Sequence, residues 1–224
     1  VRLTERQIET AEEIGADRVY TLCKITYHGF APKVLRVLNY LEKRKNSFGT
    51  TSNLADYWRM TENVYGEIPP EMAYPKDLKK MHDRMMLLQK EKTERETDEK
   101  IRRFAKDLAW MSFSDPELGL EIHPCRSQEE LIKEGKLLDH CVATYAQRVA
   151  ARETSILMIR ETKEPDMPFF TLEYKGGSVI QNRGNKNRDR TKEVRIFEEK
   201  WMTYIRREGK KHGNDRAEKQ RAGA

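Results

Sequence analysis

The sequence predicts an α+β protein, with a mainly helical N-terminal half followed by a C-terminal module of helix, three-stranded antiparallel sheet and helix. Two observations support this fold class. Apolar residues recur at helical spacing through most of the first half of the chain. After residue 150 the pattern changes to three short strand-like runs, and Gly176-Gly177 between the last two is a strong hairpin signal.

Four helices are predicted in the N-terminal half. A capping box of Thr4 and Gln7 opens the first helix, Pro32 precedes the second, and Ser52 caps the third. The fourth helix is long and begins near Lys76. Opposite charges three or four residues apart along its second part are typical of an exposed helical spacer.

The C-terminal half begins with a helix that Ser127 and Glu130 open through another capping box and that Gly135 is placed to end. A second helix is predicted over residues 138–152, and Thr191 caps a final amphipathic helix. These last two helices are expected to cover the sheet. The predicted strands of the sheet are residues 155–160, 168–174 and 178–183, with a separate short strand at residues 118–122.

The chain is predicted to have three regions. Residues 1–112 form a helical domain, residues 113–208 form an α+β domain with the candidate site, and residues 209–224 form a disordered basic tail. The sequence starts at Val1 without an initiator methionine. We therefore expect this start to be the cut edge of a longer protein.

Composition limits the cellular setting. The net charge of +6, from 43 basic and 37 acidic residues, permits a phosphate-rich partner without requiring one. Three cysteines are too few and odd in number for a disulfide framework, which favours a reducing compartment. No apolar run approaches the roughly 18 residues of a membrane helix. We therefore expect a cytoplasmic protein that has no membrane partner.

Reactive side chains gather in the last third of the chain. His140 is interpreted either as a general acid or base, or as a satisfied residue at a helix end, with Cys141 as a small core residue. Zinc binding through these two residues with His123 and Cys125 is disfavoured, because their spacing matches no familiar zinc module. We therefore expect neither a metal nor a cofactor.

The register of the predicted hairpin decides which polar groups meet. A two-residue loop places Leu172 opposite Gln181, with Glu173 on the other face. A three-residue loop places Thr171 opposite Gln181, and Glu173, Gln181 and Arg183 then share one face. Because Gly-Gly suits both loops, the sequence leaves the two registers open.

A basic loop follows the last predicted strand. Its glycine and asparagine residues let backbone amides turn outward, and the loop enters a helix, which suits a phosphate. A solvated turn is the alternative. The candidate phosphate ligands of this loop are Arg183, Lys186, Asn187, Arg188 and Arg190, with Arg160 from an earlier strand.

Several of these motifs together resemble the PcfJ-like protein family. They are His140-Cys141-Val142, Tyr145, Phe170-Thr171-Leu172-Glu173, Gln181-x-Arg183-Gly184-x-x-Asn187, and upstream Tyr74-Pro75-Lys76-Asp77-Leu78-x-x-x-His82-Asp83. Members of that family are encoded on conjugative plasmids, phages and related mobile elements, which implies a cytoplasmic bacterial setting. The resemblance supplies candidate positions but no biochemical activity.

Three functions fit these residues. The preferred one is a nucleic-acid-associated protein that binds phosphates through the basic loop, with its helical N-terminal half holding a protein partner or the rest of the chain. The second is a metal-independent ribonuclease, with His140 and Glu173 as acid and base in either order. Arg160 or Arg183 would hold the phosphate, and Tyr145 and Gln181 would orient it. A transferase using a nucleotide cofactor ranks last, because no glycine-rich nucleotide loop is visible.

Overall fold

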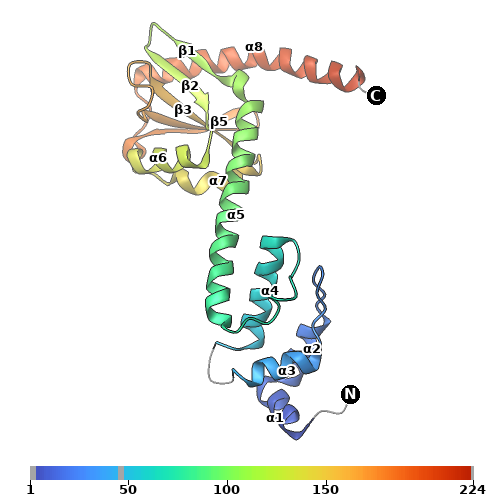
Figure 1. The fold of residues 1–224 in the computed structure, drawn as a ribbon. Coiled ribbons are helices and arrows are strands. Elements are labelled where there is room, and N and C mark those ends of the chain that lie inside the picture. The colour runs from blue at the N-terminus through green and yellow to red at the C-terminus, as the bar shows by residue number, and fades with distance from the viewer. Residues whose placement is uncertain (1–3, 45–47, 223–224) are drawn as a thin grey trace. The chain divides into compact units, whose positions relative to one another are not determined.

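The structure is a computed structural model that describes residues 4–44 and 48–222, with side chains described through residue 210 (Figure 1). It divides into two compact units, Val1–Glu94 and Arg95–Ala224. The division falls inside the long helix α5 (Leu78–Asp107), which contributes its first part to one unit and its last part to the other. None of the described helices is both long and apolar enough to cross a membrane.

The first unit is helical, as predicted. It contains α1 (Glu5–Ile14), α2 (Ala16–Lys24), α3 (Val34–Glu42), α4 (Thr51–Tyr65) and the start of α5. The capping box of Thr4 and Gln7 is confirmed in both directions. Helix α2 was not predicted, and the predicted cap of α4 is wrong. Thr50 takes that role instead of Ser52, because its hydroxyl accepts the Asn53 N–H at 3.1 Å.

The upstream Tyr74-Pro75 motif belongs to the core of this first unit. The Tyr74 ring packs edge-on against Trp58 at 5.7 Å between centroids, and the Trp58 indole donates to the Ala73 carbonyl at 2.6 Å. The Tyr40 hydroxyl donates to the Pro75 carbonyl at 2.7 Å, and burial raises the pKa of Tyr40 to about 12. The contacts of Tyr74 and Pro75 therefore stabilise the helical unit.

The second unit contains a five-stranded antiparallel sheet, so the predicted three-stranded sheet is wrong in strand number. The strand order is β1-β2-β3-β4-β5. Residues 156–160 of the central strand β3 are buried on both faces, which is typical of a sheet that helices cover on both sides. The separately predicted strand pairs with the edge of β3 that β4 leaves open. The strands are β1 (Phe113–Asp115), β2 (Leu120–Pro124), β3 (Ser155–Glu161), β4 (Phe170–Lys175) and β5 (Ser178–Gly184).

Helices cover both faces of this sheet (Figure 1). On one face lies α8 (Lys192–Ala222), whose Phe197 and Trp201 are fully buried against the sheet. The other face is covered by the last part of α5 together with α6 (Gln128–Leu138) and α7 (Ala146–Ala150). The prediction that the helices near His140 and Trp201 cover the sheet is therefore confirmed.

The predicted helix over residues 138–152 is interrupted. After α6, Asp139 adopts a left-handed conformation with φ of 51°, and His140 is extended. A 3-10 helix, η2 (Cys141–Tyr145), then leads into α7. Gly135 is not the helix end that was predicted: its carbonyl accepts the N–H groups of Asp139 and His140. His140 therefore lies at the start of η2 and not inside a helix.

The end of the chain also differs from the prediction. The Thr191 hydroxyl accepts the Val194 N–H at 3.3 Å, so the predicted cap of α8 is confirmed. The backbone of α8 continues to Ala222, where a disordered tail was predicted from residue 209. This segment contains no proline, and it is rich in lysine, arginine and alanine, which favour helices.

Gly135→Ala is expected to destabilise the second unit. A Cβ at this position would lie 2.9 Å from the His140 carbonyl oxygen, which is backbone and has little freedom to move. We expect the free energy of unfolding to fall by about 1–3 kcal/mol in urea denaturation. The matched control is Gly209→Ala in α8, where the added Cβ meets the Trp110 ring at an ordinary 3.4 Å. A Gly135→Ala variant as stable as the Gly209→Ala variant would contradict this packing.

Candidate active site

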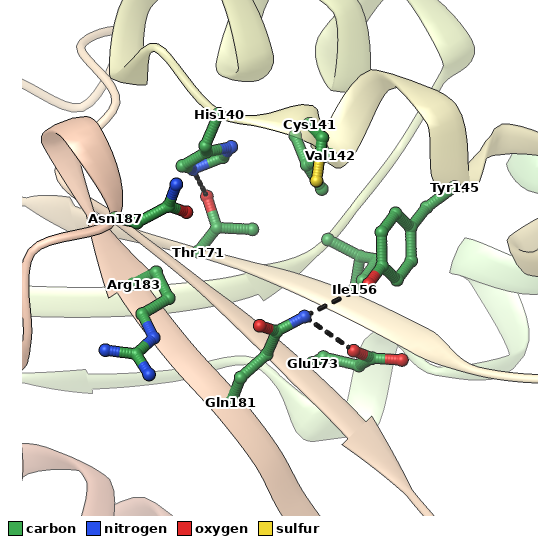
Figure 2. Close-up of a pocket in the computed structure, with 10 residues that line it drawn as sticks. All are labelled: His140, Cys141, Val142, Tyr145, Ile156, Thr171, Glu173, Gln181, Arg183 and Asn187. Carbon is green, nitrogen blue, oxygen red and sulfur yellow. Dashed lines mark hydrogen bonds between the residues drawn. The ribbon is translucent and has the colours of Figure 1, made fainter.

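A small pocket of about 40 Å³ lies between η2 and the hairpin of β4 and β5 (Figure 2). All four residues predicted to be catalytic line it, together with two of the predicted phosphate ligands. Four further lining residues were not among the predicted site residues. The ten are His140, Cys141, Val142, Tyr145, Ile156, Thr171, Glu173, Gln181, Arg183 and Asn187.

A β-bulge in the hairpin brings the polar residues onto one face. Gly176-Gly177 forms a two-residue turn, because Lys175 pairs with Ser178. The register then shifts, so that Glu173 pairs with Gln181 and Thr171 pairs with Arg183. Neither predicted register is correct. The extra residue restores the shared face that the two-residue turn alone would have lost.

Glu173 is a buried carboxylate with both oxygens occupied. Its Oε1 accepts hydrogen bonds from Thr154 Oγ1 at 2.9 Å and Arg148 Nη2 at 3.2 Å. Its Oε2 accepts from Gln181 Nε2 at 2.8 Å. This arrangement suits a group that orients its neighbours better than one that transfers protons.

Gln181 connects Glu173 to Tyr145 through its side-chain amide. The second hydrogen of its amide nitrogen reaches the Tyr145 hydroxyl oxygen at 3.1 Å (Figure 2). Because this oxygen accepts, the hydroxyl proton of Tyr145 remains available to a ligand in the pocket. The guanidinium of Arg148 lies over the Tyr145 ring, 4.6 Å from its centroid, and holds the ring in place.

His140 lines the pocket at the other end of η2 from Tyr145. Its Nε2 lies 3.2 Å from the Thr171 hydroxyl oxygen, and its other ring nitrogen points away from Thr171 (Figure 2). The extended backbone at this residue, imposed by the interruption after α6, turns the ring toward the sheet. The pocket thus contains two groups able to exchange protons, His140 and Tyr145.

Arg160, predicted as a phosphate ligand, does not line this pocket and is paired with a buried acid. Only 4% of Arg160 is exposed, and its guanidinium donates to both oxygens of Glu134, at 3.1 and 2.7 Å. Glu134 is fully buried and also accepts the Thr171 hydroxyl at 2.7 Å. The sequence analysis did not identify Glu134. Its position on the apolar stripe between Leu131 and Leu138 was the available signal.

Most arginines of the basic loop already make contacts within the protein. Arg183 pairs with Asp189, and Arg190 donates to Glu198 at 2.6 Å. Arg188 lies over the Phe170 ring, 4.9 Å from its centroid. Among these predicted ligands, Arg183 and Asn187 line the pocket, whereas Arg188, Arg190 and the exposed Lys186 do not.

The four residues weighed as zinc ligands do not form a metal site. Within the described part of the chain, no cluster of three or more His, Cys, Asp and Glu residues is placed to hold a metal ion. Cys125 is buried, which raises the pKa of its thiol, and burial lowers the pKa of His123. Cys141 is exposed and lines the pocket.

Arg160→Met is expected to destabilise the protein because it leaves the Glu134 carboxylate buried and unpaired. We expect the free energy of unfolding to fall by about 3–5 kcal/mol, measured by urea denaturation. The double variant Glu134→Leu/Arg160→Met removes both charges and should recover most of this loss. Wild-type stability of Arg160→Met combined with weaker RNA binding would instead support a phosphate-binding role.

Comparison with known proteins places the chain in a family. A model described as PcfJ-like protein matches residues 53–196. "Uncharacterized protein Lin1253/Lin1744" of Listeria innocua serovar 6a is 28% identical over 183 residues, which cover 77% of this chain and 38% of the relative. The chain thus spans well under half the length of that relative, and no solved structure matches it. Because the family model covers more than half of the sequence, the chain belongs to the PcfJ-like protein family.

Proposed function

We propose that the pocket binds and cleaves RNA by acid–base chemistry of its own side chains. The observation that supports this function best is the composition of the pocket. It combines His140 and Tyr145, which both have a free proton-exchanging position, with the cation Arg183 and the amide of Asn187. Cleavage of RNA requires a base, an acid and a cation beside the phosphate, and these residues supply all three.

The proposed reaction uses the 2′-hydroxyl of RNA as the nucleophile. His140 accepts the proton of this hydroxyl while its oxygen forms a bond to phosphorus. The bond between phosphorus and the 5′-oxygen breaks, and Tyr145 donates its hydroxyl proton to that leaving oxygen. The products are a 2′,3′-cyclic phosphate and a free 5′-hydroxyl. Water exchange then returns the proton from His140 and restores the Tyr145 hydroxyl.

Arg183 is the proposed partner of the phosphate. Its side chain is 42% exposed, and that of its present partner Asp189 is 79% exposed. An exposed ion pair of this kind contributes about 0–1 kcal/mol, so a phosphate can replace Asp189 at small cost. In this reaction Glu173 orients Gln181 and Tyr145 and transfers no proton itself.

A nucleic-acid-binding module without turnover is the second candidate function. The observation in its favour is Lys186, an exposed cation in a tight turn, with φ of 53°, beside Asn187 at the pocket. Under this proposal, Lys186, Arg188 and Arg190 hold phosphates and the pocket is structural. A mobile-element setting and a protein partner for the helical unit are further parts of this proposal.

His140→Gln and Tyr145→Phe are expected to lower RNA cleavage by about 10²–10⁴-fold each, because each removes one proton-transfer group. The measurement is cleavage of labelled single-stranded RNA by purified protein in the presence of a chelator. An all-2′-deoxy substrate of the same sequence should bind without being cut, because it lacks the nucleophile.

Two variants in the helical unit serve as matched controls. His28→Gln and Tyr65→Phe make the same chemical changes at exposed positions of the other unit, so cleavage should match wild type. Absence of turnover, with salt-sensitive RNA binding that weakens in Lys186→Ala and Arg188→Ala, would contradict catalysis and favour the binding module.

A further inference from the structure

The buried ion pair of Arg160 and Glu134 is not explained by the proposed reaction. Neither group touches the pocket, and the cost of removing two charges from water makes such a pair a poor source of stability. The pair is nevertheless connected to the pocket. The chain of contacts runs from Arg160 to Glu134, from Glu134 to the Thr171 hydroxyl, and from that hydroxyl to His140 Nε2.

The direction of each hydrogen bond in this chain follows from the number of available protons. A carboxylate paired to a guanidinium has no proton to give, so it only accepts. Thr171 has one hydroxyl proton, and Glu134 Oε1 receives it at 2.7 Å. The Thr171 oxygen is therefore an acceptor toward His140, and the atom that donates to it at 3.2 Å is the Nε2–H of the imidazole.

We infer that Glu134 and Thr171 are positioning residues that fix the tautomer of His140 with its proton on Nε2, which makes Nδ1 the proton-accepting atom of the site. The catalytic meaning of this assignment rests on the proposed ribonuclease function, but the tautomer itself does not. Within the described part of the chain, Nδ1 of His140 has no hydrogen-bond partner. Its lone pair is therefore free for a substrate hydroxyl.

This arrangement also gives a role to the negative charge of Glu134, which lies behind Thr171. When Nδ1 accepts a proton, His140 becomes a cation that still donates through Nε2. The Thr171 oxygen receives a stronger hydrogen bond, and the Glu134 carboxylate behind it stabilises the charge without taking a proton. The base, its orienting group and a buried carboxylate thus follow the general logic of an activated proton acceptor. Arg160 holds Glu134 in place by donating to both of its carboxylate oxygens.

The test is the imidazole nitrogen spectrum of the protein at pH 8, where the tautomers of neutral histidine are distinguished by their ¹⁵N shifts. The chain has five histidines, and loss of one signal set in His140→Gln assigns the relevant one. We expect the Nε2–H tautomer for His140. A wild-type spectrum dominated by the Nδ1–H tautomer would overturn the inference, whether or not RNA is cleaved.

Variants of Thr171 give a second readout. Thr171→Val removes the acceptor without changing the shape, so the His140 signal should move toward a mixture of tautomers, and Thr171→Ser should restore it. Thr154→Val, which removes a hydroxyl that contacts Glu173 but not His140, should leave the signal unchanged. In cleavage assays, kcat should fall about 2- to 10-fold in Thr171→Val, the equivalent of one neutral hydrogen bond.

The two readouts keep the inference separate from the proposed function. If no RNA is cleaved but His140 shows the Nε2–H tautomer and responds to Thr171→Val, the positioning is supported and the ribonuclease proposal fails. If RNA is cleaved and the tautomer is unchanged in Thr171→Val, the positioning is overturned and the ribonuclease proposal stands.

Discussion

The architecture of the pocket depends on the hydrogen bonds of the buried Glu134 carboxylate. It binds Arg160 from β3 and Thr171 from β4, so the end of α6 is fixed to two strands of the sheet. One residue later, the Gly135 carbonyl accepts the N–H of His140, which fixes where the chain leaves the helix. A carboxylate without exposed surface is stable only when every oxygen is satisfied, so this junction has one geometry. This junction therefore sets the position of His140 in the pocket.

The polar residues of the pocket all lie on one face of the sheet. Alternate side chains of β3 and β4, such as Leu157 and Leu172, pack against α8 and form an apolar core. The intervening positions of β4, Thr171 and Glu173, face the pocket. The β-bulge before Gln181 shifts the register of β5. Gln181 and Arg183 therefore lie opposite Glu173 and Thr171, on the same face of the sheet. The pocket face also contains apolar side chains, because Ile156 and Met158 of β3 pack against α5, α6 and α7.

Much of the fold could be predicted from the sequence, because helical spacing and strand-like runs are local signals. The predicted pocket residues were identified because reactive side chains clustered at element ends, and the structure brings His140, Tyr145, Glu173 and Gln181 together. Arg160 was misplaced because alternation along a strand does not reveal whether a polar side chain meets solvent or a buried acid. The interruption at Asp139 was missed because the left-handed residue is not glycine. The bulge was not predictable because Gly-Gly is compatible with several hairpin registers.

The central claim is that the pocket holds the phosphate that is attacked. The most direct measurement is a crystal structure of the protein with a short RNA that carries one 2′-deoxy substitution at the cleavage position, since this substrate binds without reacting. The account predicts a phosphate in contact with Arg183 and Asn187, with its neighbouring sugar facing Nδ1 of His140. A phosphate bound only by Lys186 and Arg188 on the outer loop, with no nucleotide in the pocket, would contradict it.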